Sequence, residues 1–247
     1  MDRSLYISSV GLANIERAQA ARANNLANAT TPGFRADLAR VTAREVVGDN
    51  LYASRVYGVN EGAGVDFAQG AHVSTGRDLD VAVAGEGFFA VLDAEGQEAY
   101  SRDGRFEIDN IGRLLDSRGQ QVMGRGGPVA LPPYESVLIG ADGAITIRPE
   151  GQGPEALVQV DQLKLVNPET HNLYKAANGN LYGRDFAVFE VAEGVQVNSG
   201  FVESSNVNAI NELTEILSLA RQFELEVRMM KVAETNDEAS SQLLRIG

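Results

Sequence analysis

The side chains of this chain that could carry out acid–base or metal chemistry are few and dispersed. The two histidines, His72 and His171, lie far apart, and neither has a second metal ligand at a suitable spacing. A lone histidine is far more often a surface or loop residue than a catalyst. The chain has no cysteine, which excludes disulfides, thiol catalysis and cysteine-ligated metals. We therefore predict no catalytic residue, no metal site and no cofactor.

Carboxylates offer one alternative, because a pair of them could cleave a glycosidic bond or several could bind calcium. The candidates are Asp93, Asp103, Asp109, Asp116 and Asp142. Each lies in or beside a predicted hairpin turn, where aspartate is favoured because its side chain accepts hydrogen bonds from nearby backbone amides. We favour the turn role. A peptidoglycan-cleaving hydrolase that uses Asp103 or Asp142 is the rival hypothesis.

Phosphate chemistry has equally little support. Residues 124–127 (Gly-Arg-Gly-Gly) could form a phosphate-binding loop, but no helix is predicted after them to direct backbone amides at the anion. The sequence also lacks the zinc-protease, Walker A and nucleophile-elbow motifs. These observations predict a protein that is not an enzyme.

Charge and length narrow the class further. The net charge of -13 argues against nucleic-acid partners and anionic membrane surfaces, both of which repel so acidic a chain. Apolar residues make up 44% of the 247 residues, which is enough for a buried core. No apolar run reaches membrane-spanning length, and the first residues lack a secretory signal. We expect no direct membrane insertion and no cleaved signal peptide.

A long helix is predicted near the C-terminus, between residues 206 and 230. Apolar residues recur there in alternating steps of three and four, which is the spacing of a coiled-coil seam. They are Leu213, Ile216, Ala220, Phe223, Val227 and Met230. Asn208 is a suitable N-cap, and Glu212 lies near the positive end of the helix dipole. Ile210 and Leu217 widen the apolar face, so this helix needs a partner.

A second long helix is predicted over residues 4–28, which are rich in alanine and contain no proline. Leu5, Leu12 and Leu26 recur at multiples of seven, with Ile15 on the same face. We expect the two terminal helices to form one coiled-coil-like module.

The first predicted helix ends in an asparagine-rich segment followed by a turn. Residues 31–34 (Thr-Pro-Gly-Phe) have the pattern of a type II turn. Asn24, Asn25 and Asn28 are interpreted either as caps of the helix end, which we favour, or as amides that bind neighbouring subunits.

The predicted fold class is α+β, with an antiparallel all-β domain inserted between the terminal helices. From residue 76 the apolar period changes to two and turn glycines recur, as in hairpin-linked strands. Residues 35–75 are predicted to form an extended arm with little core of its own, which packs on another surface. The predicted parts are therefore 1–34 (helix and turn), 35–75 (arm), 76–199 (β domain) and 200–247 (C-terminal helix).

Both ends of the chain resemble the signatures of the bacterial flagellar rod, hook and hook-associated proteins. The N-terminal match is carried by residues 23–28 (Ala-Asn-Asn-Leu-Ala-Asn) and 31–34. The C-terminal match is carried by residues 200–208 (Gly-Phe-Val-Glu-Ser-Ser-Asn-Val-Asn), 212–213 and 221–224. Residues 76–83, 87–89 and 100–104 are similar to the pattern shared by the proximal and distal rod proteins. The length and the ending resemble the proximal protein more.

The resemblance implies a structural subunit that leaves the cytoplasm through the flagellar type III export apparatus. It would polymerise into a tubular rod that crosses the periplasm and transmits torque. The implied partners are further copies of the chain and the rod proteins FlgB, FlgC, FlgG and FliE. A soluble adapter that forms a discrete oligomer is a third hypothesis.

The helical seams and the family motifs together assign one set of residues to subunit interfaces. These are Leu5, Leu12, Ile15, Asn24, Asn25, Leu26, Asn28, Pro32, Gly33, Phe34, Asn206, Leu213, Ile216, Ala220, Phe223, Val227 and Met230.

Overall fold

The computed structural model describes residues 3–45, 56–151, 153 and 156–245. The chain divides into two compact units. Unit 1 contains residues 1–29, 36–66 and 207–247, and unit 2 contains residues 30–35 and 67–206. The residue boundaries expected from the sequence for the four parts of the chain stay predictions.

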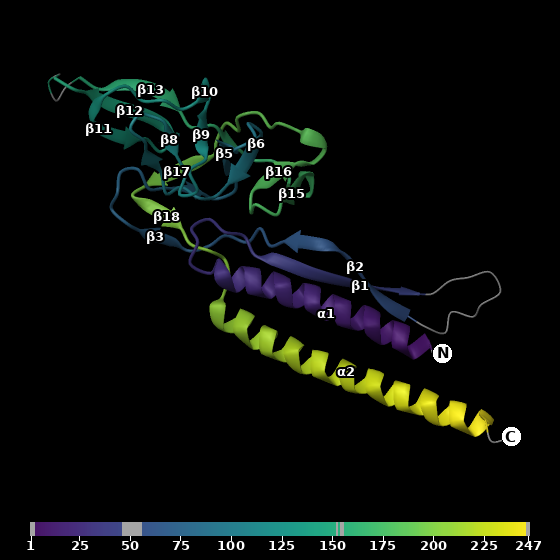
Figure 1. Cartoon of the computed structure of the whole chain (residues 1–247). Coiled ribbons are helices and arrows are strands. Elements are labelled where there is room, and N and C mark those ends of the chain that lie inside the picture. Colours follow the sequence, from purple (N-terminus) through teal and green to yellow (C-terminus); the bar gives the residue numbers. More distant parts are fainter. Residues whose placement is uncertain (1–2, 46–55, 152, 154–155, 246–247) are drawn as a thin grey trace. The chain divides into compact units, whose positions relative to one another are not determined.

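Unit 1 consists of two helices and a two-stranded antiparallel ribbon. Its elements are α1 (Arg3–Ala27), β1 (Asp37–Glu45), β2 (Val56–Val65) and α2 (Ala209–Arg245). Figure 1 shows α1 and α2 side by side, with the ribbon running along α1. The ribbon pairs Asp37 with Val65 at one end and Glu45 with Val56 at the other, with an irregularity between Ala39 and Val41. Neither helix, within the described residues, is long and apolar enough to cross a membrane.

The ribbon corrects the expectation of an extended arm over residues 35–75. A single strand leaves its backbone amides and carbonyls unpaired, whereas β1 and β2 satisfy each other's groups over most of their length. The fold-back also places β1 and β2 against α1. The described residues 36–45 and 56–66 of this segment therefore belong to the helical unit, whereas residues 67–75 belong to unit 2.

The predicted coiled-coil pair is also wrong, although the α+β class agrees with the structure. Two residues of the expected seam, Leu213 and Val227, are 50% and 43% exposed. The covered positions of α2 include two acidic residues, Glu212 and Glu226. Arg22 of α1 pairs with Glu212, so a carboxylate takes a place that a coiled coil gives to an apolar side chain.

Unit 2 is built from short antiparallel strands. They are β3 (His72–Ser74), β4 (Val81–Ala84), β5 (Phe88–Leu92), β6 (Glu98–Ser101), β7 (Glu107–Ile108), β8 (Leu114–Leu115), β9 (Gln121–Gly124), β10 (Gly127–Pro128), β11 (Tyr134–Ile139), β12 (Ala144–Pro149), β13 (Val158–Gln162), β14 (Leu165–Val166), β15 (Leu173–Lys175), β16 (Leu181–Gly183), β17 (Gln196–Ser199) and β18 (Phe201–Glu203). Two short 3₁₀ turns, η1 (Thr170–Asn172) and η2 (Arg184–Phe186), lie among them.

The strands of unit 2 form four sets around one core. The largest sheet runs in the order β15-β16-β6-β5-β9-β8-β7, with β10 beside β9 and β14 beside β5. A second sheet has the order β11-β12-β13, and β17 pairs with β4 and β18 with β3. The core contains Phe89 and Phe106, whose rings meet edge to face with centroids 5.2 Å apart.

Candidate subunit interface

The apolar interface residues predicted on α1 lie, where the structure describes their side chains, at partly covered positions. Leu12, Ile15 and Leu26 are all half-buried within unit 1. Leu5 belongs to α1, but its side chain lies outside the described residues. Covering by other parts of the same chain leaves only a fraction of each described side chain for a neighbour.

The predicted seam of α2 is partly covered and partly exposed. Ile216, Ala220, Phe223 and Met230 are half-buried, whereas Leu213 and Val227 are exposed. The half-buried and buried positions of α2 recur in steps of four and three, and they include Glu212, Leu219 and Glu226. This helical face shares four residues with the all-apolar seam and is rotated from it by about half a residue step.

An outward apolar stripe on α2 was only partly anticipated from the sequence. It consists of residues that are each more than half exposed: Ile210, Leu217, Leu225, Met229 and Val232. On a helical wheel these residues, which follow one another at steps of seven, eight, four and three, lie roughly opposite the covered face. From the sequence, Ile210 and Leu217 widen the predicted apolar face, but the other three residues do not stand out, because Arg221 and Arg228 interrupt the stripe.

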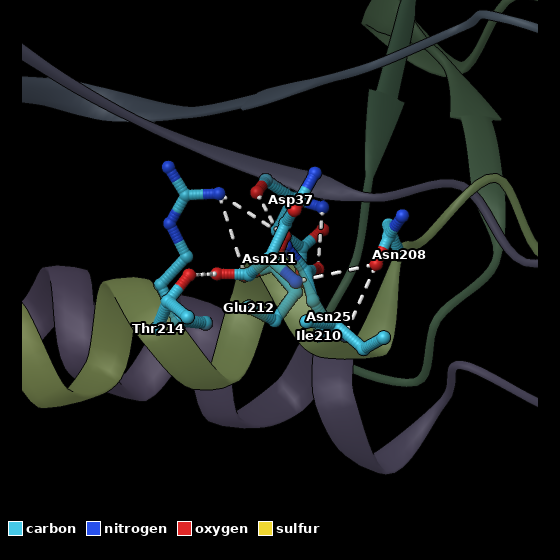
Figure 2. A network of polar contacts seen from close by, with 8 residues as sticks. Asn25, Asp37, Asn208, Ile210, Asn211, Glu212 and Thr214 are labelled. Carbon is cyan, nitrogen blue, oxygen red and sulfur yellow. Dashed lines mark hydrogen bonds and ion pairs between the residues drawn. The ribbon is translucent and has the colours of Figure 1, made fainter.

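Asn25 joins α1 to the first residue of β1. Its side chain is fully buried, donates to the Asp37 carbonyl at 2.9 Å and accepts from the Asp37 backbone amide at 2.7 Å. Figure 2 shows this pair beside the N-terminus of α2, where Asn25 also approaches Glu212 at 3.5 Å. The amide of Asn25 therefore works within the chain. Its place in a subunit interface stays a prediction.

The other two asparagines of the segment are more accessible. Asn24 is exposed and donates to the Asp37 carboxylate at 2.6 Å. Asn28 donates to the Asn24 carbonyl at 2.9 Å, one helical turn back, which is the helix-end role favoured from the sequence. Their contacts with neighbouring subunits are untested.

The start of α2 has the predicted cap. The Asn208 side-chain oxygen accepts from the backbone amides of Ile210 and Asn211 at 3.0 and 3.2 Å, as Figure 2 shows. The carboxylate of Glu212, four residues on, forms an ion pair with the Arg22 guanidinium at 3.0 Å. The ion pair and the cap together set where α2 begins and which side it turns towards α1.

The turn at residues 31–34 belongs to unit 2 and has the predicted geometry. The Phe34 amide donates to the Thr31 carbonyl at 3.3 Å, and Gly33 has a φ of +66°, which a type II turn requires. Pro32, Gly33 and Phe34 are half-buried, and the Phe34 ring carries the Lys175 ammonium 3.8 Å from its centroid. Half-buried Asn206 donates its backbone amide to the Phe34 carbonyl at 3.3 Å.

The aspartates serve the turns, as predicted. Asp93 accepts from the amides of Glu95 and Gln97 at 2.9 and 2.8 Å. The same two-amide pattern recurs at Asp109 and Asp116. Each carboxylate thus replaces backbone hydrogen bonds that a tight turn cannot make.

The pKa values of two of these aspartates shift in opposite directions. At Asp93 burial opposes the charged form, but hydrogen bonds from the Gln97 amide and the Tyr182 hydroxyl outweigh it and hold the pKa below its ordinary value. At Asp116 burial dominates and raises the pKa, with a further contribution from nearby Asp103.

The histidines are surface residues in the structure. His72 is exposed in β3, and the exposed His171 lies 3.4 Å from the Glu169 carboxylate. Within the described part of the chain, no group of three or more histidine, aspartate or glutamate side chains is placed to hold a metal ion.

Comparison with known proteins connects these features to the flagellum. The family model described as "Flagellar hook protein FlgE/F/G D1 domain" matches residues 82–147. The model described as "Flagellar basal body rod FlgEFG protein C-terminal" matches residues 198–243. These matches cover strands of unit 2 and most of α2.

Whole proteins match over nearly their full length. The flagellar basal-body rod protein FlgF of Salmonella typhimurium is 32% identical over 99% of both chains, and that of Escherichia coli is 33% identical over the same share. FlgG of Bacillus subtilis is 29% identical over all of this chain and 99% of its own.

Relatives of this kind are structural rod proteins, so the chain is a structural protein and not an enzyme. The chain belongs to the family of flagellar basal-body rod proteins. Within this family it is FlgF-like, with FlgG as a close alternative, and its place is the basal body of the flagellum.

Proposed function

We propose that the chain is a subunit of the proximal rod and polymerises into a tubular shaft that transmits motor torque across the periplasm. FlgF relatives that match from end to end support the proximal position. A distal position, as for FlgG, is the alternative. The proposal assigns the chain a mechanical role.

The outward stripe of α2 is the observation that carries the proposal. Ile210, Leu217, Leu225 and Val232 are each more than half exposed, while the opposite side of the helix is covered. A helix that is apolar on both sides is expected to be buried on both sides. Burying each of these side chains would contribute roughly 1.5–3 kcal/mol, so a neighbouring subunit has a strong reason to cover them.

A tube follows from the type of contact that such a stripe makes. When the stripe packs on a different surface of the next copy, the contact is head-to-tail, and one that does not close on itself continues as a helical assembly. We propose that Leu213 and Val227, the two exposed residues of the predicted seam, extend this interface. Leu5, Leu12, Asn24 and the other predicted interface residues stay part of the proposal.

The proposed partners are further copies of the chain and the rod proteins FlgB, FlgC, FlgG and FliE. We further propose export through the flagellar type III apparatus without a cleaved signal peptide. The acidic surface, with a net charge of -13, supports neither a nucleic-acid partner nor insertion into a membrane.

The experiment compares Leu217→Glu with Gln222→Glu in cells that lack the wild-type gene. Both changes add one negative charge to an exposed position of α2, but only Leu217 lies in the outward stripe. We expect Leu217→Glu to abolish swimming and to be absent from purified basal bodies, because a buried unpaired carboxylate is strongly unfavourable. Cells with Gln222→Glu should swim, and this variant should be present in purified basal bodies.

Two results would contradict the proposal. Leu217→Glu subunits that enter basal bodies in wild-type amounts would show that the stripe is not an assembly surface. The adapter hypothesis would be favoured if the purified wild-type protein formed only a discrete oligomer and if cells that lack the protein still swam.

A further inference from the structure

Glu203 is a fully buried carboxylate at the centre of an ion cluster in unit 2. It lies at the end of β18 and pairs with Arg35 at 2.7 Å and with Arg102 at 2.9 Å. The Gly70 backbone amide donates to the same carboxylate at 2.8 Å. Both arginines are buried as well, so all three charges are removed from water.

The two arginines extend the cluster to further backbone segments. Arg35 donates to the Ala68 carbonyl at 2.6 Å, and Arg102 donates to the Gly85 carbonyl at 2.6 Å. The Arg102 guanidinium also lies over the Phe88 ring, 5.2 Å from its centroid. Burial lowers the pKa of Arg102, and the Glu203 charge works against that shift. The carboxylate is therefore what makes two buried cations tolerable here.

The position of the cluster along the chain is informative. The chain passes between unit 1 and unit 2 after residues 29, 35, 66 and 206. Three segments of unit 2 lie at these crossings, namely residues 30–35, 67–71 and 203–206. Each of them is tied to Glu203 or to a residue bonded to it.

Hydrogen bonds that end on backbone carbonyls bind the same segments to one another. The Gly33 amide donates to the Glu203 carbonyl at 2.8 Å, and the Ser204 amide donates to the Ala71 carbonyl at 2.8 Å. The Asn206 side chain donates to the Ala68 carbonyl at 3.1 Å. The crossing segments therefore run against each other as a single bundle within unit 2.

Two glycines show how closely these segments pack. A Cβ on Gly33 would lie 2.2 Å from the Arg102 carbonyl carbon, and one on Gly70 would lie 1.9 Å from the Ser204 oxygen. No side chain fits at those separations without moving the backbone. Close packing, as well as the ion pairs, therefore fixes the positions of these segments.

We propose that Glu203 is a positioning residue that locks the crossing segments of unit 2 into one rigid anchor. The proposal rests on the proposed rod function for its purpose. In a shaft under torque, segments that could slide independently would let unit 2 yield, whereas a common anchor transmits load through all of them at once.

Hydrogen exchange of the purified full-length protein tests the anchor directly. Glu203→Asp keeps the charge but is one methylene shorter, so it cannot serve Arg35, Arg102 and Gly70 together. Gly70→Ala disturbs the same bundle through sterics, with the charges intact. Ile145→Val is the matched control, because Ile145 is a buried core residue of β12, in a different sheet.

The anchor predicts that the two bundle variants share one pattern. The amides of Gly33, Gly70, Ser204 and Asn206 should exchange about tenfold faster or more, while β5 and β6 keep their protection. Ile145→Val should give the reverse pattern, with faster exchange in the core strands. Glu203→Gln leaves two buried cations without their shared anion. This variant should show faster exchange than Glu203→Asp at the same four amides, or it should fail to fold.

Two outcomes overturn the inference. Unchanged exchange at the four amides in Glu203→Asp and Gly70→Ala would show that the cluster anchors nothing. Faster exchange spread evenly over unit 2 in the two bundle variants would show that Glu203 is an ordinary stabilising residue.

Swimming separates this inference from the proposed function. We expect Glu203→Asp subunits to enter basal bodies in wild-type amounts but to drive slower swimming in viscous medium than Ile145→Val subunits do. Equal swimming by the two variants overturns the mechanical role of the anchor. Cells that swim normally without the chain would instead refute the proposed function, and the exchange result would stand.

Discussion

Replacement of Asn25 by alanine should destabilise unit 1 substantially, although Asn25 is polar and lies near a helix end. The substitution removes two well-formed hydrogen bonds with Asp37, at 2.9 and 2.7 Å, from a fully buried site. Each bond contributes about 1 kcal/mol, and leaving a buried polar partner unsatisfied costs about 1–3 kcal/mol more. We therefore expect a loss of about 2–4 kcal/mol in the free energy of unfolding.

Asn25→Asp should be worse than alanine at neutral pH. The new carboxylate would keep the acceptor for the Asp37 amide but would face the Asp37 carbonyl and the Glu212 carboxylate. Repulsion from these oxygens raises the folded-state pKa of the introduced acid. Its cost should therefore appear as the pH rises and largely vanish in acid.

Urea unfolding followed by far-UV circular dichroism measures these losses, and hydrogen exchange at the Asp37 amide localises them. A loss of 2–4 kcal/mol corresponds to exchange faster by roughly 30- to 1,000-fold where opening limits it. Asn24→Ala is the matched control, because Asn24 is exposed and should cost less than about 1 kcal/mol. If the two alanine variants were equally stable, the argument from burial would be refuted.

Further predictions concern α1 and the turn aspartates. A Cβ on Gly11 would lie 3.7 Å from the Glu226 carboxyl carbon, an ordinary contact, so Gly11→Ala should stabilise unit 1 by about 0.5–1 kcal/mol through helix propensity, as measured by thermal unfolding. Asp93 has a lowered pKa, so the stability that its ionised form contributes is present above the ordinary carboxyl pKa and is lost on acidification. Asp93→Asn should therefore lower the free energy of unfolding at neutral pH and change it little in acid. Asp116 has a raised pKa, so its ionised form costs stability as the pH rises; Asp116→Asn, which keeps the acceptor for the Arg118 and Gln120 amides, should weaken that decline in urea titrations at several pH values.

Local features of the fold could be predicted from the sequence, because their causes are local. The cap at Asn208, the type II turn with a positive φ at Gly33 and the hairpin turn at Asp142 all follow from what one or two residues prefer. The first long helix and the start of the second were predicted close to their observed positions, because apolar spacing and the absence of proline act along one segment, although α2 continues beyond residue 230 to Arg245.

The ribbon and the rotation of α2 could not be predicted in this way. Pairing between β1 and β2 depends on a partner strand, and the weak alternation in residues 35–65 does not identify one. The face that α2 turns towards α1 depends on Arg22 reaching Glu212 across 190 residues of chain. Ile216, Ala220, Phe223 and Met230 of the predicted seam stay half-buried, but Glu212 is buried beside them while Leu213 and Val227 are exposed.

The sequence by itself determined the class of this protein: its family signatures at both ends, its lack of cysteine, its acidity, and the positions of its helices and turns. Each of these is a property of residue types or of short segments. The tertiary structure alone decided that Asn25 is buried against Asp37, that α2 carries an exposed apolar stripe, and that Arg35, Arg102 and Glu203 meet in one cluster. Those contacts join residues far apart in the chain. A local sequence pattern does not indicate which distant residues meet, because closing the chain between them costs entropy that only the packing of the whole unit offsets.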